Sequence, residues 1–152
     1  MASVTVRTAR SAEVSAISDL AERAYAVYVE RIGRRPAPMD DDYAGKIRGG
    51  HTFVAVDRGQ LAGFVVLLRK PDHLLIENVA VDPESQGQGI GRVLLNHAEA
   101  LALEYGTRTV KLYTNAAMVE NLALYAHIGY RVIERRPEDG FERVFLAKHL
   151  AA

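Results

Sequence analysis

The segment best suited to chemistry is a glycine-rich turn within VAVDPESQGQGIGRVLL, residues 79–95. Gly87, Gly89 and Gly91 lack a Cβ atom, so backbone N–H groups there can approach a ligand closely. A helical pattern begins directly after the turn, and the first N–H groups of a helix have no partner within it. Together with the helix dipole, these groups form an anion site suited to pyrophosphate.

Three phosphate-binding motifs can be compared with this turn. A P-loop requires GxxxxGK[ST], and the lysine is missing. A Rossmann fingerprint requires GxGxxG, but Arg92 stands where the third glycine should be. The pattern that remains is Gln-x-x-Gly-x-Gly, at Gln86, Gly89 and Gly91. A purely structural turn before a core helix is the alternative, and the order strand, proline, turn, helix favours the anion site, with Arg92 adding a positive charge.

This pattern resembles motif A of the GNAT superfamily of acyl-CoA-dependent N-acetyltransferases. A second segment, TNAAMVENLALYAHIGYRV at residues 114–132, resembles the family's later asparagine followed by LYxxxGY. Members commonly place an asparagine seven residues before the tyrosine, where this chain has Met118. The residues that match the LYxxxGY pattern are Leu124, Tyr125, Gly129 and Tyr130.

The resemblance implies acetyl-CoA as co-substrate and an amine as acceptor. Backbone groups of Val79 and Val81 would hold the pantetheine arm, and the amides of residues 86–91 would hold the pyrophosphate. The complete expected cofactor-binding set is Val79, Ala80, Val81, Gln86, Gly87, Gln88, Gly89, Ile90, Gly91, Arg92, Asn115 and Asn121.

The resemblance also makes Tyr125 the general acid. When an amine attacks the thioester, the CoA sulfur leaves as a thiolate. A thiol has a pKa of ~8.5 and a tyrosine of ~10, so a phenol beside the sulfur can stabilise or protonate it. The alternative is a core tyrosine, since Tyr125 shares a helical stripe with Met118 and Leu122.

The attacking amine must also lose a proton. Glu77 interrupts the apolar stretch LLIENVAV, and strand alternation places it on one face with Leu75, Val79 and Val81. Partial burial there would bring the carboxylate toward the range useful for a base. The alternatives are a water chain as the base, and an ion-paired or solvated Glu77 without a catalytic role.

The acceptor side is expected to come from residues 31–43, because the first two helices and their loop often form this wall in the family. Arg31, Arg34 and Arg35 could receive an acidic group, or form a solvated face. Asp40, Asp41 and Asp42 could attract a cationic amine, although capping of the second helix is favoured for them. The acceptor could be a small amine, an amino acid or a protein amine.

Hydrophobic periodicity predicts the elements that position these residues. The near-continuous apolar stretch Leu74–Val81 predicts a strand buried on both faces. Ser11 is a candidate N-cap for the first helix. We expect an α/β (mixed α+β) fold, a single GNAT-like domain over residues 1–152 with a twisted mixed sheet of about six to seven strands and helices on both faces. The predicted strands are residues 4–8, 52–57, 61–69, 74–81, 109–114, 130–135 and 142–147, and the predicted helices are residues 11–29, 41–48, 89–105 and 119–127.

Composition excludes several function classes. The chain has 152 residues and no cysteine, which excludes a disulfide, a thiolate metal site and a cysteine nucleophile. Its 19 basic and 19 acidic residues balance, so no basic surplus suggests a nucleic acid or membrane partner. Five histidines without HExxH spacing predict no metal site. Because the sequence shows no apolar signal segment and no membrane-spanning segment, we expect a cytoplasmic protein. Residues 140–148 could also pair with a second copy to form a homodimer.

Two other functions remain as alternatives to the acetyltransferase. One is a non-catalytic acyl-CoA-binding or sensory domain of the same fold, which would bind CoA without turnover. The other is an unrelated α/β interaction module whose glycine turn binds no anion. The presence of Tyr125 favours the enzyme, because a non-catalytic domain has no need of the acid.

Overall fold

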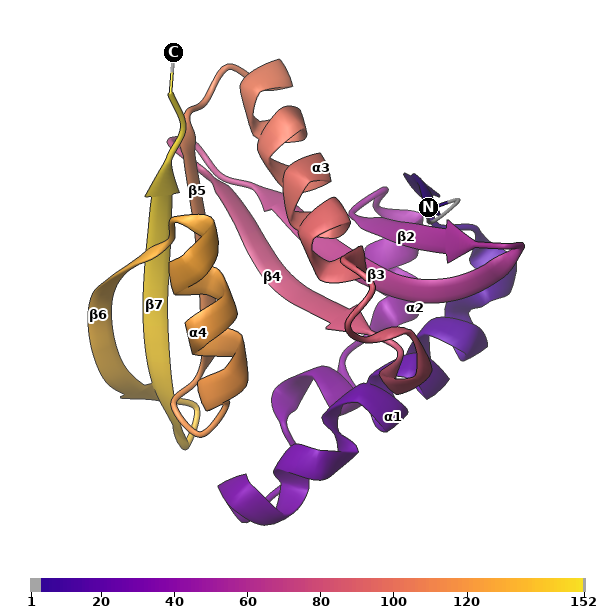
Figure 1. The fold of residues 1–152 in the computed structure, drawn as a ribbon, viewed down its shortest axis with the longest axis horizontal. Helices are drawn as coiled ribbons and strands as arrows, with labels where there is room; N and C mark the ends of the chain where they lie inside the picture. The colour runs from indigo at the N-terminus through magenta and orange to yellow at the C-terminus, as the bar shows by residue number, and fades with distance from the viewer. Residues whose placement is uncertain (1–3, 152) are drawn as a thin grey trace. The chain divides into compact units, whose positions relative to one another are not determined.

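The computed structural model describes residues 4–151 and contains a mixed sheet with α-helices, as the sequence predicts (Figure 1). The strand order is β1-β2-β3-β4-β5-β7-β6, with β4 and β5 parallel. The strands are β1 Val4–Thr8, β2 Thr52–Asp57, β3 Gln60–Arg69, β4 Leu74–Val81, β5 Thr109–Asn115, β6 Arg131–Glu138 and β7 Phe141–His149. The α-helices are α1 Val14–Ile32, α2 Tyr43–Arg48, α3 Ile90–Glu104 and α4 Val119–Ile128.

The chain divides into two compact units, which are described separately. The first comprises residues 4–67 and 78–97, and the second comprises residues 68–77 and 98–151. The first unit therefore holds β1, β2, α1 and α2 together with the glycine turn. The second holds β5, β6, β7 and α4. The expectation of a single domain over residues 1–152 stays a prediction.

In the first unit, consecutive residues of β3 show how helices cover both faces of the strand. A Cβ atom on Gly63 would lie 3.1 Å from a methyl group of Leu94 in α3, so this face packs against α3. The next residue, Phe64, packs its ring against Tyr43 of α2, with ring centroids 5.3 Å apart. Successive side chains of a strand point to opposite faces, so α3 and α2 lie on opposite sides of β3.

The burial of β4 differs from the prediction. Its residues alternate between buried and half-buried along Leu74–Val81, so only one face is fully enclosed. The expectation that both faces are buried was therefore wrong. The buried face carries Asn78, while Glu77 lies on the half-buried face with its predicted neighbour Leu75. The strand tolerates Glu77 because the face that carries it is not sealed in apolar contacts.

In the second unit, the β6–β7 hairpin is longer than predicted. The strands run to Glu138 and from Phe141, joined by Asp139 and Gly140 with φ angles of 54° and 82°. Two consecutive positive φ values are typical of the type I′ turn that Asp-Gly favours. Pro137 lies inside β6, which the sheet tolerates because β6 is an edge strand.

The start of α1 also corrects the sequence interpretation. Ser11 is not the N-cap, because it lies in a 3-10 turn at Ser11–Glu13 and α1 begins at Val14. The carboxylate of Glu13 instead accepts a hydrogen bond from the Arg10 N–H at 2.7 Å. It also forms an ion pair with Arg7 of β1 at 2.7 Å. The hydrogen bond from Arg7, opposed by burial and assisted by the Arg10 N–H, lowers the pKa of Glu13 to about 2.

We expect Glu13→Gln to lower the free energy of unfolding at pH 7 by about 1–2 kcal/mol, because a charged hydrogen bond is lost. The folded pKa of Glu13 is depressed from 4.5 to about 2, so its contribution is complete above the unfolded pKa and fades as the pH falls. Urea unfolding at pH 7 and pH 3 should therefore show a smaller difference from the wild-type protein at pH 3. Glu30→Gln, at an exposed position of α1, is the control. An equal difference at both pH values would contradict the assignment.

Candidate functional site

Asp82 fixes the path of the chain where β4 leads into the glycine turn. Its backbone N–H donates to the Ala62 carbonyl of β3 at 2.8 Å. Its carboxylate accepts from the Glu84 N–H at 3.0 Å and from Arg23 of α1 at 2.6 Å. Burial acts to raise the pKa of Asp82, but the hydrogen bonds from Arg23 and the Glu84 N–H outweigh it and lower the pKa. Asp82 therefore caps the short 3-10 helix Pro83–Ser85 and anchors it to α1 and β3.

The glycine turn itself requires a backbone conformation that glycine adopts most readily. Gly87 and Gly89 have φ angles of 82° and 79°, in the left-handed region. Among the described residues, nothing lies within 4 Å of a Cβ atom added at either position. The two glycines are thus required by the backbone conformation and not by crowding. Residues 86–89 are exposed, whereas Ile90 is buried and anchors the start of α3.

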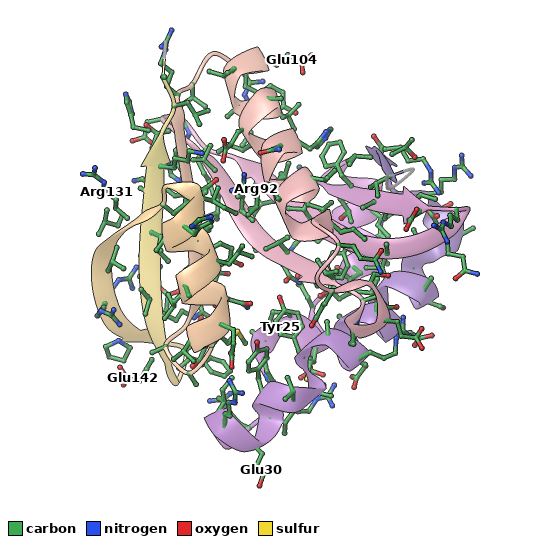
Figure 2. All side chains as sticks on the ribbon, in the orientation of Figure 1. Tyr25, Glu30, Arg92, Glu104, Arg131 and Glu142 are labelled. Carbon is green, nitrogen blue, oxygen red and sulfur yellow. The ribbon has the colours of Figure 1, made fainter. Side chains whose placement is uncertain are left out.

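The first turn of α3 presents the N–H groups that the sequence predicts for an anion site. The carbonyl of Gly89 accepts the first helical hydrogen bond, from the Val93 N–H at 3.1 Å. In a helix that begins this way, the N–H groups of Ile90, Gly91 and Arg92 have no i−4 acceptor within the helix. The side chain of Arg92 is exposed and extends from this turn (Figure 2). The arrangement can hold an anion with main-chain N–H groups and one positive side chain.

The residues expected to hold pantetheine lie at the end of β4 in the same unit. Val79 and Val81 are half-buried, and Ala80 is buried against β3. The Val79 carbonyl oxygen lies 3.0 Å from the Tyr25 hydroxyl oxygen. The Val81 carbonyl lies 3.4 Å from the side-chain amide nitrogen of Gln86. The structure thus brings the end of β4 and the glycine turn together. The ligand contacts of these residues stay predictions.

In the second unit, the LYxxxGY segment forms the end of α4. Gly129 has a φ angle of 113°, and both its N–H and that of Tyr130 bond to the Tyr125 carbonyl, at 3.1 and 2.9 Å. This is a typical left-handed helix end, which explains the glycine. Tyr125 is 5% exposed, and its ring centroid lies 6.3 Å from that of Tyr130.

Tyr130 belongs to a polar cluster that the sequence analysis missed. Its hydroxyl donates to Glu99 of α3 at 3.2 Å, and Glu99 pairs with Lys148 of β7 at 3.0 Å. Burial, followed by the negative charge of Glu99, raises the pKa of Tyr130. A signal was present in the sequence, because Glu99 stands three and four residues from the apolar Ala102 and Leu95 on one helix face.

The two asparagines of the second segment lie on either side of Met118. Asn115 ends β5, and its side-chain oxygen accepts from the Ala117 N–H at 2.9 Å. The Asn121 side chain approaches the Met118 sulfur at 3.8 Å. Met118 is buried and immediately precedes α4. Both asparagines therefore help to shape the turn before α4, and their contacts with CoA stay predictions.

In the first unit, most charged side chains of residues 31–43 interact with other residues of the protein. Arg35 pairs with Glu22 of α1 and with Asp40. Asp42 caps α2 by accepting from the Gly45 N–H at 3.0 Å, as the capping interpretation predicts. The neighbouring Asp41 pairs with Lys46 instead. The guanidinium of Arg31 lies 5.3 Å from the centre of the Tyr28 ring.

Among residues 4–151, no group of three or more His, Asp or Glu side chains could hold a metal ion. Within the same range, no helix has the length and apolar character needed to cross a membrane.

The Acetyltransferase (GNAT) family matches residues 14–130, which include the glycine turn and the LYxxxGY segment. A ribosomal protein bS18-alanine N-acetyltransferase from Escherichia coli (strain K12) is 33% identical over 78 residues, covering 51% of this chain and 53% of that protein. Streptothricin acetyltransferase from Streptomyces lavendulae is 34% identical over 94 residues, covering 60% of this chain and 50% of that protein. The chain thus spans about half the length of these curated relatives.

Two solved structures share the fold over nearly the whole chain. A PaiA N-acetyltransferase from Thermoplasma acidophilum, in complex with coenzyme A, has a TM-score of 0.81 at 16% identity, covering 97% of this chain and 99% of that one. The ribosomal-protein-S18-alanine N-acetyltransferase from Escherichia coli has a TM-score of 0.78 at 23% identity, covering 98% and 95%. At these identities the likeness establishes the fold alone. The match over residues 14–130 establishes more: the chain belongs to the acetyltransferase (GNAT) family.

Proposed function

We propose that this protein transfers an acetyl group from acetyl-CoA to a primary amine. The observation that carries the proposal is the start of α3, where left-handed Gly87 and Gly89 lead into a helix turn with main-chain N–H groups available to a ligand. Relatives of the same fold are named as complexes with coenzyme A and with acetyl-CoA. The diphosphate of acetyl-CoA is an anion that such a turn can bind.

In the proposed reaction, the amine nitrogen attacks the carbonyl carbon of the thioester directly. A bond forms between nitrogen and carbon, and the carbon–sulfur bond breaks with its electron pair leaving on sulfur. The chain contains no cysteine, so the acetyl group does not pass through a cysteinyl intermediate. The products are the acetylated amine and CoA.

Tyr125 would supply a proton to the departing sulfur. Its side chain is buried, and exclusion of water strengthens the interaction of a phenol with a developing negative charge. The hydroxyl of a tyrosine side chain can donate its proton to the departing thiolate. General acid catalysis of this kind typically contributes about 10²- to 10⁴-fold to the rate.

Removal of the amine proton needs a base, for which two candidates remain. Glu77 lies half-buried on β4, one residue before Asn78, and its carboxylate could accept the proton directly. A chain of water molecules leading to bulk solvent is the other route. Substitution of Glu77 by Gln distinguishes the two routes. If Glu77 is the direct base, kcat/KM should fall most at low pH, where few amine molecules are already unprotonated. If water carries the proton away, kcat/KM should change little.

The proposed acceptor class is a primary amine, on a small molecule or on a protein. Relatives of this chain carry names for both kinds of acceptor, a ribosomal protein alanine and streptothricin. A panel of amines with a readout for released CoA thiol would identify the acceptor. If the protein binds acetyl-CoA and releases no CoA thiol with any amine, it is a non-catalytic acyl-CoA-binding domain.

Gly89→Glu is expected to abolish acetyl-CoA binding, because the new carboxylate both blocks and repels the diphosphate. Gly106→Glu is the matched control. Gly106 also has a positive φ angle, 84°, and an added Cβ there meets nothing within 4 Å among the described residues, but it follows the opposite end of α3. Isothermal titration calorimetry with acetyl-CoA should show binding only by the control. Equal affinity of the two folded variants would remove the site from the glycine turn.

Tyr125→Phe is expected to lower kcat by about 10²-fold or more and to change the Kd for acetyl-CoA by less than about threefold, since only the proton donor is lost. Steady-state kinetics and calorimetry together measure this difference. Tyr105→Phe removes a hydroxyl from an exposed tyrosine and should leave both quantities unchanged. Parallel losses of kcat and acetyl-CoA affinity in the Tyr125 variant would show that the hydroxyl has a structural role instead.

A further inference from the structure

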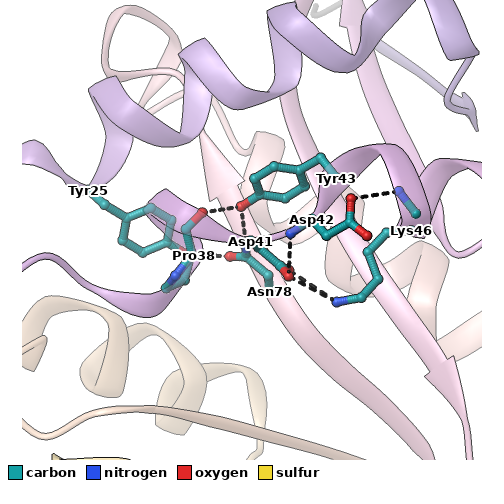
Figure 3. Close-up of polar contacts among 8 residues, drawn as sticks. Tyr25, Pro38, Asp41, Asp42, Tyr43, Lys46 and Asn78 are labelled. Atoms are coloured by element: carbon teal, nitrogen blue, oxygen red, sulfur yellow. Dashed lines mark hydrogen bonds and ion pairs between the residues drawn. The ribbon is translucent and has the colours of Figure 1, made fainter.

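A polar residue, Asn78, occupies the buried face of β4. It is 6% exposed, and its neighbour on that face in the same unit is the buried Ala80. A buried amide without hydrogen-bond partners is costly, so its contacts are informative. Its side-chain oxygen accepts from the Tyr25 hydroxyl of α1 at 2.5 Å, and its side-chain nitrogen donates to the Tyr43 hydroxyl of α2 at 2.8 Å (Figure 3).

The order of donors fixes the orientation of this amide. The Tyr43 hydroxyl has one proton, which it donates to the Pro38 carbonyl. Toward Asn78 it must therefore accept, and within that amide only the NH₂ group can donate. The amide oxygen then faces Tyr25, whose hydroxyl donates to it and also lies 3.0 Å from the Val79 carbonyl. These hydrogen bonds therefore run from Tyr25 to Asn78, from Asn78 to Tyr43 and from Tyr43 to Pro38.

These contacts join three parts of the first unit to one point on β4. Tyr25 comes from α1, and Tyr43 is the first residue of α2. Pro38 lies between them (Figure 3), in the short 3-10 helix Ala37–Asp40. Met39 of this helix is buried. The hydrogen bonds through Tyr43 therefore hold the segment between α1 and α2 against β4 at Asn78.

The place of Asn78 along β4 suggests what its hydrogen bonds with Tyr25 and Tyr43 do for function. In the proposed function, the diphosphate of acetyl-CoA binds after the end of β4, and the resemblance to the family implies that Val81 and then Val79 hold its pantetheine arm. The thioester then lies toward Asn78, away from the diphosphate. A segment held at Asn78 borders the reacting end of the co-substrate, where the amine must enter.

We propose that Asn78 is a positioning residue for the amine acceptor, holding the segment Ala37–Asp40 through Tyr43 at the reacting end of acetyl-CoA. This inference rests on the proposed function. Asn78 acts through Tyr43 and Pro38 and does not itself carry out a chemical step. Buried hydrogen bonds suit this role, because they fix a loop in one arrangement relative to the strand that binds the co-substrate.

Tyr43→Phe tests the proposal by removing the link between Asn78 and Pro38. Hydrogen exchange followed by mass spectrometry, without any ligand, should show faster exchange in peptides covering residues 36–43 and no change in those covering α3. Tyr25→Phe removes the same atom from the other side of Asn78 and should leave exchange of residues 36–43 unchanged. Asn78→Ala removes the hydrogen bonds to Tyr25 and Tyr43, leaves that from Tyr43 to Pro38, and should also accelerate exchange of residues 36–43.

The kinetic expectation for Tyr43→Phe is a KM for the amine raised by about 3- to 10-fold, the loss that one net hydrogen bond produces. The Kd for acetyl-CoA and kcat at saturating amine should stay within about twofold of the wild-type values. Tyr105→Phe controls for the chemical change and should alter neither exchange of residues 36–43 nor the KM.

Three other results would contradict the proposal. Unchanged exchange of residues 36–43 in Tyr43→Phe would show that the hydrogen bonds do not hold the segment. Faster exchange with an unchanged amine KM would show that the segment does not position the acceptor. If the wild-type protein acetylates no amine, the proposed function fails and the acceptor role fails with it, while the exchange data still decide whether Asn78 holds the segment.

Discussion

The backbone conformation at Gly87 and Gly89 is the constraint on which the proposed site depends. A helix can offer its first N–H groups to a ligand only if the chain enters it without covering them with side chains. The two left-handed residues make this possible, because they turn the chain sharply after Pro83–Ser85 and leave α3 to start at Ile90. A residue with a Cβ atom would be strained at either position.

The turn also needs fixed support on both sides, since an anion site that moves loses part of its binding energy as entropy. Asp82 supplies the support before the turn, through its contacts with Arg23 and the backbone of Glu84 and Ala62. Ile90 supplies it afterwards, through burial of its side chain. The residues between are exposed and contribute mainly their main chain, so their side chains are under little structural constraint.

The sequence predicted the strands, the helices and the glycine turn because each is encoded by neighbouring residues. Periodic apolar positions mark the helices and strands, and closely spaced glycines mark the turn before α3. It did not predict that Glu13 would replace Ser11 in organising the start of α1, because that depends on Arg7 in a different element. The pairing of Asn78 with Tyr25 and Tyr43 joins residues 53 and 35 positions apart, which no local pattern contains.

The two tyrosines of the LYxxxGY segment differ in what their surroundings allow. A general acid must be able to exist briefly as a phenolate after its proton has been transferred. Tyr130 donates to the carboxylate of Glu99, so a phenolate there would face a negative charge at hydrogen-bond distance in a buried setting. This repulsion keeps the Tyr130 hydroxyl protonated, so Tyr130 is a poor acid. The protonated hydroxyl continues to donate to Glu99, which pairs with Lys148. The mechanism proposed above therefore uses Tyr125, and not Tyr130, as the proton donor.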